Sequence, residues 1–418
     1  MSEMTLSEEL QWRGSFHQTT FKDITAIDGK PLTFYFGVDP SAASMTIGNL
    51  AAAMLIRRFI DRGHKAILLV GGATGLIGDP DGKAQERDLK TMEEVAANKA
   101  GVIAQYQRIF EGKDFEIVDN YDWFKDMGYL QFLRDVGKHV PMRQMLSRDF
   151  VQTRLGEDGA GISYAEFSYS LIQGYDFLHL SREKGASLQL CGSDQWGNCI
   201  AGVELIRRIT GKEAHVLSMP LVINRATGVK FGKTEGGAVW LDPTLTTPTQ
   251  FYQFWINCDD EGVEEYIKLY TLLNKDEVDA IMAKHREDPR QRIAQTRLAQ
   301  EVTKLVHGAQ ELAIAEQVTS VLTNRTPIGD ADNAVIESVR KEIAATAAKP
   351  GDSIIDVLEQ TGLTASKSEA RRLLQGNAIA VNGVKVTRET FEDADFQNGR
   401  LLLRKGKAFK DSALIEQN

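Results

Sequence analysis

The chain has 418 residues, of which 26% are charged, 42% are hydrophobic and 8% are aromatic. This composition is typical of a folded globular protein with two or three domains, and it excludes a disordered, collagen-like or coiled-coil chain. The 49 Lys and Arg residues are outnumbered by 58 Asp and Glu residues, and the net charge of -9 argues against a surface that is basic all over. Any contact with nucleic acid should therefore be local.

The apolar runs are too short to cross a membrane. The runs at residues 65–72 and 200–203 are well below the roughly 18 residues that a spanning helix needs. The N-terminus is acidic and polar, where a signal peptide would be basic and then apolar. Cys191, Cys199 and Cys258 are an odd number without a C-x-x-C pair. We therefore expect a cytoplasmic protein with reduced thiols and no metal site.

The N-terminal part is predicted to alternate strands with helices. Residues 32–38 combine apolar and β-favouring side chains, which indicates a strand. Residues 47–62 carry apolar side chains at helical spacing, and a second apolar run follows at residues 66–72. These three segments predict a right-handed βαβ unit with parallel strands. Further strands are expected at residues 115–118, 187–190 and 215–219, and further helices at residues 162–177 and 198–209.

This pattern predicts an α/β fold with a Rossmann-like, doubly wound parallel sheet over residues 1–220. Residues 221–248 form a connection, and residues 249–323 have the apolar spacing of an α-helical domain. Residues 324–350 mix Pro, Gly, Ala and charge, as in a linker. Residues 351–418 are predicted to form a small α+β domain.

Three stretches are expected to meet beyond the carboxyl ends of the strands, where open parallel sheets bind ligands. In residues 35–49, Gly48 stands at a helix start that favours phosphate, although such a turn alone is weak evidence. Residues 71–83 are glycine-rich and are followed by basic residues, which indicates a phosphate-binding loop or, alternatively, a tight solvated loop. Residues 230–237 place two lysines and a threonine among glycines, which suits a flexible clamp on a polyphosphate.

A polar stripe lies on the helix predicted at residues 162–177. Tyr169, Gln173 and Asp176 recur at i, i+4 and i+7 and so share one face. Such a stripe is either a satisfied buried network or the wall of a binding site, and composition does not decide between the two.

A second local feature is the basic run at residues 400–410, which is interpreted as a solvated strand end or as a nucleic-acid contact.

Together these stretches resemble the bacterial type of class I tyrosyl-tRNA synthetase over nearly the whole chain. The matching motifs, in order, are YFGVDPSA, LVGGATGLIGDPDGK, NYDW, FLRDVGKH, EFSYSLIQGYDF, GSDQWGN and KFGKTEGGAVWLD. The segment SKSEARRLLQGNAIAVNG resembles an S4-type RNA-binding domain. The resemblance implies a catalytic domain over residues 1–220, a signature loop within 221–248, an anticodon-binding-type domain over 249–323 and an S4-like domain over 351–418.

The resemblance also implies residue roles. Tyr35 and Asp176 match the positions that contact the phenol hydroxyl of tyrosine, and the remaining tyrosine positions are Asp39, Asp79, Tyr169, Gln173 and Gln195. The positions matched to ATP are Gly37, Ser41, Gly48, Gly192, Asp194 and Lys233. The catalytic positions, around the pyrophosphate, are Thr46, Asn49, Lys83, Arg87, Lys230, Lys233 and Thr234. Contacts with tRNA are expected from Lys367, Arg371, Arg372, Arg404 and Lys405.

One motif departs from the family. The family reads His, a small apolar residue, Gly and His at the start of the first helix, whereas this chain has Thr46-Ile47-Gly48-Asn49. The Asn49 amide can donate a hydrogen bond as imidazole does, but Thr46 is a shorter donor that is never charged. Ser41 stands where the family usually has threonine.

The implied reaction joins tyrosine to ATP, forming tyrosyl-adenylate and pyrophosphate, and then transfers tyrosine to the 3′ end of tRNA(Tyr). Mg²⁺ is expected to arrive with ATP, without a structural metal, and a homodimer is expected, for which residues 124–140 are a candidate interface. Two alternatives are an RNA-binding protein without activity and a tryptophanyl relative. The KFGKT and GSDQ segments argue against the first alternative, and Tyr35 with Asp176 argues against the second.

Overall fold

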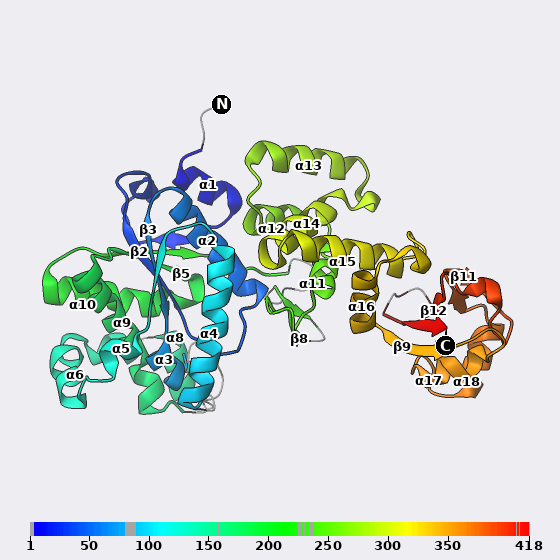
Figure 1. Ribbon diagram of the computed structural model, residues 1–418. Coiled ribbons are helices and arrows are strands. Elements are labelled where there is room, and N and C mark those ends of the chain that lie inside the picture. Colours follow the sequence, from blue (N-terminus) through cyan, green and yellow to red (C-terminus); the bar gives the residue numbers. More distant parts are fainter. Residues whose placement is uncertain are drawn as a thin grey trace. The chain divides into compact units, whose positions relative to one another are not determined.

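The computed structural model of the protein describes residues 4–79, 89–146, 148–156, 159, 161–224, 228, 231–234, 237–406, 408 and 410–417. The chain divides into two compact units (Figure 1). Unit 1 comprises residues 1–245 and 259–294, and unit 2 comprises residues 246–258 and 295–418. Within the described ranges, no helix combines the length and the apolar character that crossing a membrane requires.

Unit 1 is built on a six-stranded sheet with the order β1-β6-β5-β2-β3-β4. Strands β2 to β6 run parallel to their neighbours, whereas β1 is antiparallel to β6 at the edge. The strands are β1 (Gln18–Thr19), β2 (Thr33–Val38), β3 (Lys65–Val70), β4 (Phe115–Val118), β5 (Leu188–Gly192) and β6 (His215–Met219). The predicted parallel α/β sheet is confirmed. Strand β1 is not among the predicted elements because two residues are too few for a periodic signal.

Helices cover both faces of this sheet, with α2 and α4 on one face and α9 and α10 on the other (Figure 1). The alternation of side chains along β2 explains the two layers. Phe34 packs on Phe59 of α2, with ring centroids 5.3 Å apart, while the next residue, Tyr35, packs on Phe177 of α9 at 5.1 Å. The α-helices of unit 1 are α1 (Leu6–Arg13), α2 (Ile47–Asp61), α3 (Gly72–Ile77), α4 (Met92–Ile109), α5 (Tyr121–Phe124), α6 (Tyr129–Asp135), α7 (Met142–Leu146), α8 (Asp149–Leu155), α9 (Tyr164–Lys184), α10 (Trp196–Thr210), α12 (Val263–Tyr270) and α13 (Lys275–Glu287).

Unit 2 contains a five-stranded sheet with the order β11-β10-β12-β13-β9, in which β9 runs parallel to β13 and the other pairs are antiparallel. The strands are β9 (Ala344–Ala348), β10 (Ile379–Val381), β11 (Val384–Lys385), β12 (Arg400–Lys405) and β13 (Ser412–Gln417). The α-helices are α11 (Pro248–Ile256), α14 (Ile293–His307), α15 (Ala309–Leu322), α16 (Asn333–Glu342), α17 (Ile354–Gln360) and α18 (Lys367–Gln375), of which α14 begins two residues before the unit does.

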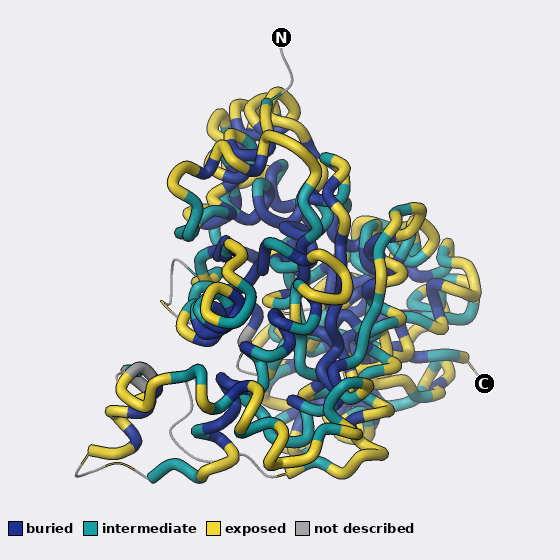
Figure 2. The backbone as a smooth tube through the Cα atoms, turned by 90° about the vertical axis from the view of Figure 1, so that its left-hand side faces the viewer, coloured by how far each residue is buried: buried dark blue, intermediate teal, exposed yellow. Residues whose placement is uncertain are grey.

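The sheet of unit 2 also has two buried faces. Leu401 and Leu403 of β12 belong to the core formed with α17 and α18, whereas Leu402 belongs to the core formed with α15 and α16. Figure 2 colours the backbone by burial, with buried stretches mainly inside and exposed turns mainly on the outside. The predicted small α+β domain therefore includes residues that precede position 351.

Residues 324–350, predicted to be a linker, are folded. They contain helix α16 and strand β9, and β9 pairs with β13 in register from Ala344 opposite Ala413. The sequence of β9, AATAA, has no apolar alternation, so the strand forms because β13 provides a partner along its length. The segment at 249–323 is helical as predicted, but α12 and α13 belong to unit 1 and α11 and α15 to unit 2. The predicted boundaries at residues 220, 248 and 323 stay predictions.

Candidate active site

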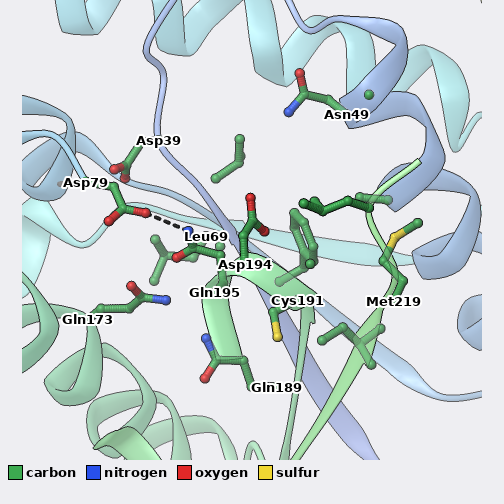
Figure 3. A pocket seen from close by; sticks show the side chains of 18 of the residues that line it. Asp39, Asn49, Leu69, Asp79, Gln173, Gln189, Cys191, Asp194, Gln195 and Met219 are labelled. Atoms are coloured by element: carbon green, nitrogen blue, oxygen red, sulfur yellow. Dashed lines mark hydrogen bonds between the residues drawn. The ribbon is translucent and has the colours of Figure 1, made fainter. Parts of the chain in front are cut away.

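A cavity of about 400 Å³ opens in unit 1 at the carboxyl ends of the parallel strands (Figure 3). Its lining includes residues at the ends of β2, β3, β5 and β6 and the first turn of α2, as expected for an open parallel sheet. The structure brings together there every predicted tyrosine, ATP or catalytic position whose side chain it describes. These residues are Tyr35, Gly37, Asp39, Ser41, Thr46, Gly48, Asn49, Asp79, Tyr169, Gln173, Asp176, Gly192, Asp194 and Gln195.

The structure describes the basic residues predicted around the pyrophosphate only in part. Lys83, Arg87 and Lys230 lie outside the described residues. For Lys233 and Thr234 the backbone is described, and it forms strand β7 (Lys233–Thr234), which pairs antiparallel with β8 (Gly237–Ala238). The signature segment therefore includes a short antiparallel strand pair, and Phe231 just before it lines the cavity.

Acidic side chains gather at one end of the cavity. The Tyr169 hydroxyl donates a hydrogen bond to Asp39 Oδ2 at 2.6 Å, and Thr74 Oγ1 donates to Asp39 Oδ1 at 2.6 Å. Gln195 Nε2 donates to Asp79 Oδ2 at 2.6 Å, which Figure 3 shows as a dashed line. Burial, together with the negative charges of Asp39 and Asp79, raises the pKa of Tyr169 well above its usual value. Its phenol therefore stays neutral and keeps a proton to donate, in a setting that favours a bound cation.

The cavity lining also includes one buried carboxyl group, that of Asp176. Asp176 accepts hydrogen bonds from Asn120 Nδ2 at 3.2 Å and from Trp123 Nε1 at 3.0 Å. Burial raises the pKa of Asp176 well above its usual value, although these two bonds act in the opposite direction. An additional donor would therefore stabilise the ionised carboxylate.

Three polar atoms at the cavity lack hydrogen-bond partners among the described residues, namely Tyr35 Oη, Gln173 Oε1 and Gln189 Oε1. All three residues line the cavity, and the side chain of Tyr35 is 1% exposed. A buried polar group without a partner costs about 1–3 kcal/mol, so such groups mark places where a ligand completes the structure. A ligand that offers a hydroxyl near Asp176 would meet Tyr35 as well, since the two residues lie in the same buried region.

The sequence analysis named the NYDW motif, residues 120–123, but gave no role to Asn120 or Trp123, which hold the Asp176 carboxylate. Asn120 donates to Asp176 and also to Thr74 Oγ1 at 3.0 Å, so it connects the Asp39 and Asp176 groups. Trp123 follows three residues later. Both residues come directly after β4, and this position beyond the carboxyl end of a parallel strand was the available signal.

The start of α2 carries the residues that depart from the family motif. Thr46 Oγ1 donates to Asn49 Oδ1 at 3.0 Å, and the Thr46 backbone N–H donates to the same oxygen at 2.9 Å. Asn49 lies on the opposite side of the cavity from Asp39 and Asp79 (Figure 3). A Cβ atom at Gly48 would meet only Thr46 Oγ1, at 3.5 Å, so the glycine leaves the cavity open beside the helix start.

The glycine-rich stretch at residues 71–83 differs from the predicted phosphate loop. Its residues 72–77 form helix α3, and the first backbone N–H groups of that helix are taken by the protein itself. Gly72 donates to Asp119 Oδ1 at 2.9 Å, and Ala73 donates to Asn120 Oδ1 at 2.7 Å. A Cβ atom at Gly71 would lie 2.5 Å from Asp39 Oδ1, so this glycine permits a carboxylate to approach the backbone. The rest of the stretch, from residue 80, lies outside the described residues.

Comparison with known proteins identifies the family. Residues 28–323 match the model of the class I tRNA synthetases for W and Y, and residues 335–410 match that of the SYY-like C-terminal domain of tyrosine–tRNA ligase. This chain belongs to the class I tyrosyl-tRNA synthetase family. The predicted resemblance and the predicted fold class are thereby confirmed.

Relatives of known name cover nearly the whole chain. The tyrosine–tRNA ligase of Bacteroides fragilis is 42% identical over 97% of this chain and 98% of its own length. That of Bacillus caldotenax is 45% identical over 92% of each chain. Among solved structures, a C-terminally truncated mitochondrial tyrosyl-tRNA synthetase from Aspergillus nidulans is similar with a TM-score of 0.69 and 29% identity, covering 76% of this chain and 94% of that one.

Proposed function

We propose that the chain is a tyrosine–tRNA ligase whose cavity binds tyrosine and ATP side by side. The observation that supports this most directly is the buried Asp176 carboxylate beside a Tyr35 hydroxyl that has no hydrogen-bond partner in the described part of the chain, at the carboxyl ends of the parallel strands. The test is tyrosine-dependent exchange between pyrophosphate and ATP by the full chain. An RNA-binding protein without enzymatic activity would catalyse no such exchange, and a tryptophanyl relative would require tryptophan.

The tyrosine substrate is placed by its two polar ends. Its phenol hydroxyl donates to Asp176 and contacts Tyr35, because a buried carboxylate gains most from an additional donor. Its ammonium group lies at the acidic end of the cavity, and the residues assigned to this end are Asp39, Asp79, Tyr169, Gln173 and Gln195. One end of the cavity accepts a hydrogen bond and the other end favours a cation. This difference orients the amino acid with its carboxylate toward ATP.

The nucleotide occupies the side of the cavity near the start of α2. Asp194 is assigned to the ribose, and Gly192 permits its position, because a Cβ atom there would lie 2.7 Å from Asp194 Oδ1. The open helix start at Gly48 and the segment around Ser41 and Gly37 are assigned to the rest of ATP, which enters as its Mg²⁺ complex.

Adenylate formation requires only that the protein positions the two reactants and stabilises the developing charge. The carboxylate of tyrosine is already a nucleophile, so it attacks the α-phosphorus in line without a general base, and pyrophosphate leaves. Negative charge grows on the pyrophosphate, and the groups assigned to it are Thr46, Asn49, Lys83, Arg87, Lys230, Lys233 and Thr234. The adenylate then passes tyrosine to the terminal ribose of tRNA(Tyr).

Replacing Thr46 by Ala should lower the rate constant of adenylate formation less than about tenfold, equivalent to about 1.4 kcal/mol. The Thr46 hydroxyl donates to Asn49 at 3.0 Å, and a neutral hydrogen bond of this kind contributes only about 0.5–1.5 kcal/mol. Thr46→His should neither abolish activity nor be required for it. Single-turnover experiments measure the rate constant of adenylate formation in the parent protein and in both variants. A parent that forms no adenylate until Thr46→His restores the reaction would refute the proposed activity.

The S4-like part of unit 2 is proposed to bind tRNA through α18. Arg371 and Arg372 are exposed on this helix, and Lys367 at its start pairs with Asp356 at 2.7 Å. Arg404 donates to the Leu322 carbonyl and, at 3.1 Å, to Ser412 Oγ, so it also holds strand β12 in place. We therefore rank the arginines of α18 ahead of Arg404 and the half-buried Lys405 as tRNA contacts.

Reversing both charges with Arg371→Glu and Arg372→Glu should lower kcat/KM for tRNA charging by roughly tenfold or more at low salt. The salt dependence of charging should become shallower, by a slope of about one for each phosphate group that the helix no longer binds. Tyrosine-dependent pyrophosphate exchange should stay unchanged, because it needs no tRNA. Lys341→Glu on α16 serves as the control for a charge change elsewhere in unit 2. Equal loss of charging and exchange would contradict a tRNA role.

An exposed apolar surface on unit 1 supports the proposed homodimer. A groove of about 320 Å³ is lined by residues that include Phe124, Phe132 and Tyr164, and Leu130 on α6 is 80% exposed. Contiguous apolar surface of this kind is typical of an interface between chains. Separately, we propose that the protein is located in the cytoplasm.

The full chain should therefore scatter light as a dimer at micromolar concentration, and Leu130→Asp should shift it to a monomer, because an ionised side chain cannot enter an apolar interface without a partner. The exposed Leu245, replaced by Asp, is the control. A parent protein that is monomeric and fully active would overturn the proposal.

A further inference from the structure

An aromatic contact links the signature segment to a helix that lies outside the cavity lining. Phe231, which lines the cavity, stacks on Tyr266 of α12 with ring centroids 4.1 Å apart and an angle of 24° between the ring planes. Tyr266 is fully buried and Phe231 is 6% exposed. Tyr270, one helical turn further along α12, lies 6.0 Å from Phe231. The roles proposed for the predicted site residues do not account for this contact.

The backbone on both sides of Phe231 is also fixed. The Phe231 N–H donates to the Val222 carbonyl at 2.9 Å, and the Val239 N–H donates to the Gly232 carbonyl at 2.9 Å. Val239 in turn accepts a hydrogen bond from the Ile47 N–H at 3.1 Å. A Cβ atom at Gly232, whose φ is +91°, would collide with the Ile47 side chain, so only glycine permits this approach to α2.

Helix α12 is itself held firmly against the rest of unit 1. Arg58 is 3% exposed and donates to the carbonyl oxygens of Lys268 at 3.2 Å and Thr271 at 3.1 Å. Arg13 donates to the Lys268 carbonyl at 2.8 Å and to the Leu273 carbonyl at 2.8 Å. These bonds satisfy the carbonyl groups at the C-terminal end of α12 with positive charge, which the helix dipole favours.

The Tyr266 ring is fixed at its hydroxyl end as well. Tyr266 Oη donates to Asp259 Oδ2 at 3.3 Å, and the Gly262 N–H donates to the other oxygen of Asp259 at 2.5 Å. A Cβ atom at Gly262 would lie 2.5 Å from Tyr266 Cζ, so the ring lies directly on the glycine backbone. The ring therefore has little freedom to move away from Phe231.

We infer that Tyr266 is a positioning residue for adenylate formation, which holds Phe231 and thereby fixes where strand β7, with Lys233, begins. Lys233 is two residues from Phe231, so the stacked ring acts together with the hydrogen bonds of Phe231 and Gly232 in setting the backbone that leads to the lysine. Displacements of about 1 Å at reacting groups can cost about 100-fold in rate. The inference rests on the proposed role of Lys233 toward the pyrophosphate, and it adds a residue that contacts neither substrate.

The test compares Tyr266→Leu with Tyr266→Phe in the full chain. We expect Tyr266→Leu to lower the single-turnover rate constant of adenylate formation roughly three- to thirtyfold, while the Kd for tyrosine stays within about twofold of the parent value. Tyr266→Phe keeps the stacked ring and should restore most of the rate. Tyr106→Leu is the matched control, because Tyr106 is also a fully buried tyrosine of unit 1 but stacks on Phe110, and neither residue lines the cavity.

A double-mutant comparison shows whether Tyr266 acts through Phe231. The variant Phe231→Leu with Tyr266→Leu should be no slower than Phe231→Leu alone, because Phe231→Leu by itself already removes the stacking between the two rings. Additive losses, an unchanged rate in Tyr266→Leu, or an equal loss in Tyr106→Leu would overturn the inference. If both Tyr266→Leu and Lys233→Ala leave the rate constant of adenylate formation unchanged, the proposed role of Lys233 is wrong. If Lys233→Ala lowers this rate constant and Tyr266→Leu does not, only the positioning role of Tyr266 is wrong.

Discussion

Replacing Asp176 by Ala should lower kcat/KM for tyrosine activation by at least about 100-fold, because hydrogen bonds to a charged group contribute about 1.5–3 kcal/mol and removal of the acceptor also leaves donors unpaired. The unpaired donors are the Asn120 amide and the Trp123 indole, which lie 3.2 Å and 3.0 Å from the carboxylate. The protein should remain folded, as judged by circular dichroism and the melting temperature. Pyrophosphate exchange at varied tyrosine concentration measures the effect.

A second readout separates the phenol contact from general damage to the pocket. The preference for tyrosine over phenylalanine should collapse in Asp176→Ala, because phenylalanine lacks the hydroxyl that the carboxylate accepts. Burial raises the pKa of Asp176, so tyrosine affinity should fall as the pH is lowered through a value above the usual 3.9 or so of an aspartate. Asp176→Asn should remove this pH dependence. A variant that keeps both its tyrosine activity and its selectivity would show that the phenol site lies elsewhere.

Replacing Lys233 by Ala should slow adenylate formation by about 10²–10³-fold, because a preorganised donor facing developing charge typically contributes about 2.7–4 kcal/mol to the transition state. Tyrosine affinity should change little, since Lys233 is assigned to the pyrophosphate and not to the groups proposed to hold the amino acid. Rapid-quench measurement of adenylate, with tyrosine binding measured separately by fluorescence, gives both quantities.

The control for this variant is Lys275→Ala. Lys275 is an exposed lysine of unit 1 that pairs with Asp279 at 2.7 Å on α13 and does not line the cavity. Its removal should leave both the rate and the affinity unchanged. The assignment of Lys233 would be wrong if its removal weakened tyrosine binding strongly and left the rate constant unaltered.

The cavity was predictable because its residues lie at positions that the strand pattern fixes. Asp39 follows β2, and Asp194 follows β5, so the parallel order of the sheet places both at the same edge. The face shared by Tyr169, Gln173 and Asp176 follows from helical spacing, and the structure places all three on the cavity wall. Their individual roles toward tyrosine remain proposals that the variants above will test.

Other features depend on contacts between residues far apart in the chain. The glycines at 71 and 72 indicate a phosphate loop when only the sequence is considered, but Asp119 and Asn120, almost 50 residues later, occupy the N–H groups of α3. Strand β9 has no strand-like pattern and forms through its register with β13. Neither partner can be inferred from local spacing.

The sequence by itself therefore determined the parallel α/β sheet, the helical segments, the position of the cavity and the family, because periodic apolar spacing and contiguous motifs are properties of short stretches. The tertiary structure decided which groups complete the cavity. Asn120 and Trp123 hold the Asp176 carboxylate, and Tyr266 stacks on Phe231 across 35 residues of chain. A side chain's partners depend on how distant elements pack, and packing is fixed by the whole fold rather than by any one segment.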